Sequence, residues 1–304
     1  MKTLAYAGTI ALALAATAGA AHAADLPTKQ EGRVWVDQNF VLAFSPNWSW
    51  TTMPGARSEF ARSREGAAGL QFLELFFGPN YTYKTGNWTL KGSLWYYYMG
   101  YPQRGRMKEQ SNGSLACSFN PNVVAPADCT STYNFSHNLE IVPSAEYRFG
   151  RWSVYDRVIF HNTFYADAYS TPDTKTGLSV SDQRWGLGTV LRELLQTRFA
   201  VSDRLGVFLM DEVFVGILED SDTSKLRDAK GQYAGYKSTG YWKDGLRANR
   251  TYLGFDYKVA PNFTLAPMYM VEVGMNPVDS TDVTDIAHNF FLIATITAST
   301  FGNK

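Results

Sequence analysis

Apolar and polar residues alternate along most of this chain, in segments separated by turn-forming residues. In the segment "RTYLGFDYKV", Leu253, Phe255 and Tyr257 share one face of a strand, whereas Tyr252 and Asp256 share the other. Successive side chains of a β-strand point to opposite faces, so the alternation predicts strands with one apolar and one polar side. Since the pattern recurs along the chain, an all-β fold is predicted.

The patterned segments are long enough to cross a membrane as tilted strands, which takes about 9–11 residues each. Short turns and long loops alternate between them, as in bacterial outer-membrane barrels. The pattern predicts a transmembrane antiparallel β-barrel of about ten strands, with eight or twelve as alternatives, short periplasmic turns, long extracellular loops and both chain ends in the periplasm. The predicted strands cover residues 33–45, 69–84, 87–99, 137–149, 152–165, 183–199, 204–217, 247–259, 263–274 and 287–301, and the long loops include 46–68 and 100–136.

The N-terminal segment "MKTLAYAGTIALALAATAGAAHA" has the features of a secretory signal peptide. It starts with the basic Lys2, continues through an apolar stretch and ends in an Ala-His-Ala cleavage site. A transmembrane helix is the competing interpretation, but small residues predominate and a cleavage site is present. The prediction is a cleaved signal peptide at 1–23 and a single barrel domain at 24–304, located in the bacterial outer membrane.

Charge and cysteine content narrow the class of protein. The 304 residues include 28 basic and 28 acidic side chains, and loss of Lys2 with the signal peptide leaves a slight acidic excess. A nearly neutral chain lacks the basic surface that binds nucleic acid, so no nucleic-acid partner is expected. The two cysteines of an exported chain predict one disulfide, Cys117 to Cys129. No metal-ligand spacing or phosphate-binding glycine loop occurs, so no metal and no cofactor are expected.

The two faces of the predicted strands suit different surroundings. The apolar faces end in aromatic residues, whereas the polar faces carry charges of both signs along their length. In a membrane barrel the apolar face meets lipid and the charged face meets the lumen. The residues predicted to form a lumen network are Glu74, Lys91, Glu140, Glu146, Arg148, Arg157, His161, Arg192, Glu212, Arg250, Asp256 and Glu272.

This network has two interpretations. Its charges line a polar path, or they fill a narrow barrel that has room for little except side chains, and the second interpretation is preferred. Face parity also sets hairpin register, because a one-residue slip would turn a strand inside out. A two-residue turn at 150–151 places Glu140 opposite His161. Between Lys258 and Thr264, face parity requires three loop residues, which places Arg250 opposite Glu272.

The segment "LKGSLWYYYMGYPQRGR" carries aromatic residues on both faces of one predicted strand. Tyr96 and Tyr98 fall on the apolar face near the end of the strand, and Trp95 and Tyr97 fall on the polar face. Tyrosine is enriched at membrane interfaces, where its ring lies at headgroup level. Tyr96 and Tyr98 are therefore predicted to belong to the outer aromatic girdle, and the other two rings to point into the lumen.

The C-terminal third of the chain resembles a known family. The segments "RFAVSDRLGVFLMDEVFVGI" and "GLRANRTYLGFDYKVAPNFTLAPMYMVEV" combine an apolar strand ending in Asp-Glu-Val-Phe, an Asn-Arg strand, a tight turn and a Tyr-containing strand. This pattern is similar to that of a proteobacterial family of outer-membrane β-barrels of unknown function. The resemblance implies fold and location, and supplies no catalytic or binding residues. Phe301 resembles the terminal aromatic residue of a barrel assembly signal, although Gly302, Asn303 and Lys304 follow it.

Candidate catalytic groups are few. His137, His161 and His288 are the histidines of the mature chain. His137 and His161 lie near the outer ends of adjacent predicted strands, as in the rim sites of outer-membrane hydrolases, but parity points His161 inward and His137 outward. No serine lies at a spacing that places a nucleophile within reach of a histidine base. No catalytic residue is therefore predicted.

The sequence predicts an integral outer-membrane barrel of structural or transport type, such as a narrow or gated pore for small solutes. Two alternatives stay open: an enzyme acting at the extracellular rim, and a surface receptor or adhesin that uses the loop at 100–136. The expected partners are outer-membrane lipid, the barrel assembly machinery during biogenesis, and a small solute.

Overall fold

The structure is a computed structural model that describes residues 29–62, 69–103, 107–109, 115–117, 132–169, 181–218, 225–227, 233–236, 245–275 and 283–301. Every secondary-structure element assigned in these ranges is a β-strand, so the all-β prediction is confirmed. In the same ranges, no helix is long and apolar enough to cross a membrane. The predicted signal peptide and Cys129 of the predicted disulfide lie outside the described residues, whereas Cys117 ends the short strand β6 (Leu115–Cys117).

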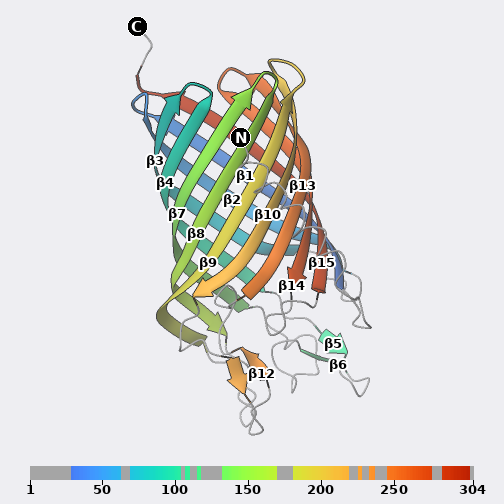
Figure 1. Ribbon diagram of the computed structural model, residues 1–304. Helices are drawn as coiled ribbons and strands as arrows, with labels where there is room; N and C mark the ends of the chain where they lie inside the picture. The colour runs from blue at the N-terminus through green and yellow to red at the C-terminus, as the bar shows by residue number, and fades with distance from the viewer. Residues whose placement is uncertain are drawn as a thin grey trace.

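Within the described part of the chain, eleven strands form one closed barrel (Figure 1), one more than the predicted ten. Two small hairpins, β5–β6 and β11–β12, lie beyond one end of the barrel (Figure 1). Besides β6, these hairpins contain β5 (Met107–Glu109), β11 (Lys225–Arg227) and β12 (Tyr233–Tyr236). The barrel strands are β1 (Lys29–Ala43), β2 (Trp48–Arg62), β3 (Gly69–Thr85), β4 (Trp88–Gln103), β7 (Thr132–Phe149), β8 (Trp152–Tyr169), β9 (Ser181–Ala200), β10 (Leu205–Leu218), β13 (Gly245–Ala260), β14 (Phe263–Met275) and β15 (Val283–Ser299).

The additional strand is β2, which lies in a segment predicted to be a loop. Pro54 and Gly55 form a dipeptide typical of turns, yet they lie in the middle of β2. Gly55 lies opposite Asp37 on β1 and opposite Glu74 on β3. A side chain at Gly55 would meet both of these acidic side chains, so the glycine gives them room to approach each other. The predicted loop at 46–68 is therefore wrong.

The two ends of the barrel differ in their connections (Figure 1). Tight turns follow β1, β3, β7, β9 and β13 at one end, the turn end, where β15 also finishes. The longer connections and the start of β1 lie at the opposite end, the loop end. Two of the tight turns begin with Gly86 and Gly150, whose φ angles of 54° and 61° are the left-handed values that two-residue hairpin turns require. Strand β1 therefore starts and β15 finishes at opposite ends of the barrel, whereas an even number of strands would start and finish at the same end.

The barrel closes by pairing β1 with β15. The two strands run parallel, with Lys29 beside Asp285 and Ala43 beside Ser299. The other pairs of neighbouring barrel strands in the described residues are antiparallel. An odd number of strands joined up and down makes the first and last run the same way, so their closure is parallel. Single-chain bacterial barrels usually have even strand numbers, and this seam departs from that rule.

The predicted hairpin registers are confirmed. Glu140 lies opposite His161 across the turn between β7 and β8. Arg250 lies opposite Glu272 across the turn between β13 and β14. Because the registers hold, each strand sends alternate side chains into the barrel, and Trp95 lies inside, only 7% exposed.

The outward face of the barrel carries a broad aliphatic band. Leu94, Ile141, Leu209 and Leu253 are among its large exposed side chains, and Leu253 is the most exposed of them at 64%. Each belongs to a different strand, so the band continues around the barrel. Apolar surface of this extent is unusual on a soluble monomer.

Aromatic rings flank the aliphatic band at both ends. Towards the loop end, the Tyr96 hydroxyl is hydrogen-bonded to His137 Nδ1, and the Tyr98 and Phe135 rings stack with their centroids 6.1 Å apart. Tyr96 and Tyr98 thus lie on the outward face. At the turn end, rings of neighbouring strands pair at centroid distances of 5.1, 4.8 and 4.8 Å, in the pairs Trp48–Tyr81, Trp88–Tyr147 and Trp152–Phe199.

Candidate functional site

Polar and charged side chains form a continuous ring of contacts around the inside of the barrel, here called the polar belt. They come from inward-facing positions on nine of the barrel strands, and most of them are buried. The members of the polar belt are Glu31, Arg33, Trp35, Glu74, Tyr97, Asn138, Glu140, His161, Thr163, Arg192, Glu212, Arg250 and Glu272.

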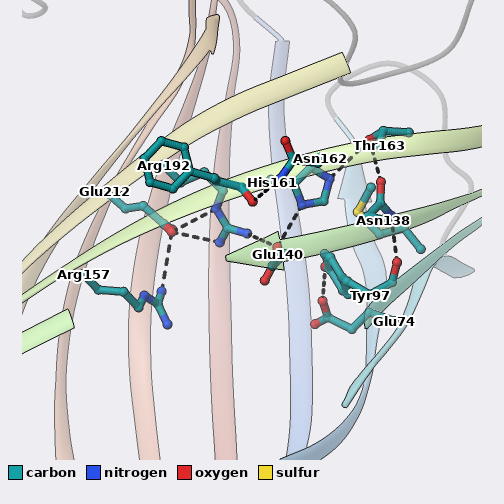
Figure 2. A network of polar contacts seen from close by, with 12 residues as sticks. Glu74, Tyr97, Asn138, Glu140, Arg157, His161, Asn162, Thr163, Arg192 and Glu212 are labelled. Carbon is teal, nitrogen blue, oxygen red and sulfur yellow. Dashed lines mark hydrogen bonds and ion pairs between the residues drawn. The ribbon is translucent and has the colours of Figure 1, made fainter. Parts of the chain in front are cut away.

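Glu212 on β10 is the most heavily contacted carboxylate of the belt. Arg192 Nη2 on β9 donates to Glu212 Oε1 at 2.8 Å, and the Tyr252 hydroxyl on β13 donates to Oε2 at 2.7 Å. Arg157 and Arg250 approach the same carboxylate at 3.6 and 3.7 Å. Figure 2 shows Arg157 and Arg192 converging on Glu212. Three guanidinium groups thus surround one carboxylate that is 1% exposed.

From Arg192 the belt continues to a carboxylate–imidazole pair. Arg192 Nη1 lies 3.5 Å from Glu140 Oε1, and His161 Nδ1 lies 2.8 Å from the same oxygen. His161 Nε2 lies 3.5 Å from Thr163 Oγ1. The Thr163 hydroxyl donates to Asn138 Oδ1 at 2.5 Å (Figure 2). This arc therefore joins β9, β7 and β8 through side chains alone.

The order Glu140–His161–Thr163 bears on the alternative that the protein is an enzyme, since hydrolases combine an acid, a base and a hydroxyl in this order. A nucleophilic hydroxyl gives its proton to the base and must be accessible to substrate. The Thr163 proton is instead donated to Asn138, and Thr163 is buried. The arrangement links three strands and does not present a reactive hydroxyl.

Beyond Asn138 the belt reaches the first strands of the barrel. Asn138 Nδ2 donates to the main-chain carbonyl of Tyr97 at 2.9 Å, and the Tyr97 hydroxyl donates to Glu74 Oε2 (Figure 2). Trp35 Nε1 donates to Glu74 Oε1 at 3.0 Å. Trp35 lies on β1 and Glu74 lies on β3, so this bond passes over β2 beside Gly55. Close approach at Gly55 therefore helps to connect the belt.

The other arc of the belt returns from β13 to β1. Arg250 Nε donates to Glu272 Oε2 at 2.5 Å, and Arg33 Nη1 donates to Glu272 Oε1 at 3.0 Å. Arg33 also forms an ion pair with Glu31 on its own strand. Because Arg33 and Trp35 both lie on β1, the two arcs meet there and the belt closes around the lumen.

Trp35 packs inside the belt against several strands at once. Its ring stacks on Phe291 of β15 at a centroid distance of 4.9 Å and meets Phe72 of β3 edge-on at 5.7 Å. The guanidinium groups of Arg57 and Arg250 each lie 5.3 Å from its centroid. A cation over an aromatic ring contributes about 0.5–2 kcal/mol. One indole thus ties β1, β2, β3, β13 and β15 together.

A cavity of about 370 Å³ lies in the barrel beside the belt. Its lining includes charged members of the belt together with aromatic and methionine side chains. Much of the remaining interior is occupied by apolar side chains that pack against one another. The buried residues of this apolar cluster are Trp35, Phe72, Tyr97, Met99, Phe208, Tyr252, Met268 and Met270.

The charges of the belt alternate, so that buried carboxylates face cations or hydrogen-bond donors. Removing a charge from water costs several kcal/mol, and only good pairing recovers that free energy. Glu272 meets both Arg250 and Arg33, and Glu140 meets both Arg192 and His161. Each of these carboxylates has two partners, so the loss of one member would leave its neighbours with buried charge that is poorly compensated.

The residues predicted from the sequence for the lumen occupy three places. Lys91 and Arg157 line the cavity. Two ion pairs lie outside the belt, closer to the turn end: Arg148 with Glu146 at 2.9 Å, and Asp256 with Arg198 at 2.7 Å. Those that lie in the belt are Glu74, Glu140, His161, Arg192, Glu212, Arg250 and Glu272.

Sequence reasoning missed the lumen residues of the first two strands. Arg33, Trp35 and Asp37 lie on the inward face of β1, and Arg57 lies on that of β2. The signal was present in "GRVWVDQNF", where these three positions alternate with Val34 and another valine. It was not used, because inward faces were assigned only for later strands and β2 was predicted to be a loop.

In the described residues, no group of three or more His, Cys, Asp or Glu side chains is placed to hold a metal ion.

The chain is a closed β-barrel. No family model and no curated protein matches it. Among solved structures, the translocator domain of the autotransporter NalP from Neisseria meningitidis is similar, with a TM-score of 0.42 and 12% identity over 75% of this chain and 69% of that chain.

Proposed function

We propose that this protein is an integral β-barrel of the bacterial outer membrane and forms a narrow, gated path for small solutes. The observation that carries the location is the outward face, where an aliphatic band is flanked by aromatic rings at both ends. Exposure of this apolar band to water would be energetically unfavourable, whereas contact with lipid acyl chains is favourable. Tyr and Trp rings at its edges suit the membrane interface.

The orientation and biogenesis in this proposal follow those of bacterial barrels. The turn end faces the periplasm, and the loop end faces the outside. The segment 1–23 directs export and is cleaved, outer-membrane lipid surrounds the barrel, and the assembly machinery inserts it. The C-terminal segments support membership of the proteobacterial family that they resemble.

The lumen supports a path that is closed at rest. Charged members of the polar belt line the cavity, which provides space for a solute. Trp35 and Tyr252 are 6% and 4% exposed and pack in one apolar cluster within the barrel. Passage of a solute would therefore require these rings to move, so the open state is rare.

Single-channel recording in planar lipid bilayers tests this function. We expect rare, brief openings for the wild-type protein and a severalfold higher mean conductance for Trp35→Ala, which removes the central indole. The matched control is Trp48→Ala, because Trp48 is 45% exposed on the outward face, and its removal leaves the lumen unchanged.

Heat-dependent electrophoretic mobility establishes that each variant has folded before it is recorded. Silence of the wild-type and Trp35→Ala proteins would overturn the pore. A large and steady wild-type conductance would show instead that the belt lines an open channel and that no gate exists.

A further inference from the structure

Two sets of polar atoms with opposite hydrogen-bonding character face the same cavity without partners. On β1, Asp37 Oδ1 and Asn39 Oδ1 accept no hydrogen bond from the described residues. On β8, Arg157 Nε donates none to them. All three side chains line the cavity of about 370 Å³, and Asp37 is only 2% exposed. A buried polar atom without a partner is destabilising, so these atoms call for a polar occupant of the cavity.

The donors belong to a basic row across three adjacent strands. Lys91 on β4 lies opposite Ser144 on β7, and Ser144 lies opposite Arg157 on β8. Lys91 Nζ lies 5.6 Å from the centroid of the Trp95 ring, and no ion pair joins it to a carboxylate of the described residues. Arg157 reaches Glu212 only at 3.6 Å. Two cations that flank a hydroxyl suit a carboxylate or another acidic group.

The acceptors belong to an acidic row across the first three strands. Asp37, Gly55 and Glu74 lie opposite one another on β1, β2 and β3. Glu74 is occupied by the Trp35 and Tyr97 donors, whereas Asp37 keeps one oxygen without a partner. Asp37 and Glu74 approach so closely across Gly55 that the two carboxyl groups share one negative charge. This shared charge and the aromatic rings of the cavity lining suit an ammonium group.

We propose that the cavity binds a small zwitterion, whose acidic group contacts Lys91 and Arg157 and whose ammonium group contacts Asp37 and Asn39. Its volume lies in the range of about 300–1,000 Å³ that is typical of small-molecule sites. The ring of Trp95 provides apolar surface for the carbon chain between the two charged groups. The inference rests on the proposed function, since it names the class of solute that the lumen admits.

Isothermal titration calorimetry of the full-length protein in detergent micelles tests the inference. The probes are the ω-amino acids from glycine to 6-aminohexanoate, with hexanoate and hexylammonium as analogues that carry one charge each. We expect one member of the series to bind at least tenfold more tightly than either analogue. The series also measures the distance between the two rows, because only a probe of matching length can contact the basic row and the acidic row at once.

Two pairs of variants locate the site. Lys91→Met and Asp37→Asn should each weaken the best probe at least tenfold. Lys84→Met and Asp203→Asn, at exposed positions outside the cavity lining, should leave binding unchanged. Absence of binding by every probe, equal binding of the singly charged analogues, or unaltered binding in both cavity variants would overturn the inference.

Binding of the probe series to the wild-type protein tests the inference even if a cavity variant fails to fold. The test is also separate from the test of conductance. A protein that binds the zwitterion and never conducts would keep this site and lose the pore, whereas a protein that conducts and binds no probe would keep the pore and lose this site.

Discussion

Asp37 and Glu74 approach each other across Gly55, although their strands, β1 and β3, are not neighbours in the barrel. The intervening strand has no side chain at this position, so groups from either side of it meet above its backbone. Through Glu74, this approach also connects Trp35 to the polar belt. A residue that resembles a turn former in the sequence is therefore part of the lumen architecture.

Replacing Gly55 with alanine is expected to destabilise the barrel by about 1–3 kcal/mol, because the new methyl group overlaps Asp37 and Glu74. Urea unfolding in lipid vesicles, followed by tryptophan fluorescence, measures the change. Gly92→Ala on β4 is the matched control, since a side-chain carbon there meets nothing within 4 Å. Equal stability of the two variants would contradict the close approach at Gly55.

Glu212→Gln is expected to destabilise the barrel by about 3–5 kcal/mol, because Arg192, Arg157 and Arg250 would lose the charge that they share. Glu146→Gln should cost less than about 1 kcal/mol, since its partner Arg148 is 68% exposed to solvent. The same unfolding measurement compares both variants. Similar losses would mean that the belt contributes no more than a surface ion pair.

Leu253→Arg is expected to impair insertion by about 2–4 kcal/mol, because this outward side chain would meet the middle of the bilayer. Val259→Arg, on the same face of β13 but next to the turn, should cost about 0–1 kcal/mol. The inward Asp256→Asn should insert normally. Folding yield into vesicles measures all three, and equal defects at Leu253 and Asp256 would speak against the assigned faces.

The predicted disulfide has a direct chemical test. Mass spectrometry of protein taken from intact cells should find Cys117 joined to Cys129. A ring of this size would stabilise the fold by about 3 kcal/mol by restricting the unfolded chain. Thiols that can be alkylated without prior reduction would disprove the bond.

Period-two patterning was sufficient to predict the strands in which it is unbroken. Both faces of β7 and β13 could be assigned, and the opposition of Arg250 and Glu272 followed from parity alone. This succeeds because the side-chain period of a strand is two, so one correct residue determines the facing of all the others. The all-β class follows from the same regularity.

Period-two alternation failed to predict β2, where the residue types are explained by contacts with residues distant in sequence. Pro54 and Gly55 have the local properties of a turn, and only Asp37 and Glu74 on the neighbouring strands explain why glycine is needed within β2. Omission of one strand gave an even number, and with it the wrong end for the start of β1. The closure of the belt through Trp35 depends on contacts among five strands, which no local pattern specifies.

The parallel seam has a consequence for biosynthesis. It places Lys29 beside Asp285, whereas each of the other pairings joins two barrel strands with no third barrel strand between them in the sequence. A nascent polypeptide that has not yet received β15 therefore carries two unpaired strand edges, and such edges recruit other chains into aggregates. A polypeptide that ends before β15 cannot close the barrel, so both of its edge strands stay open to pairing with other chains.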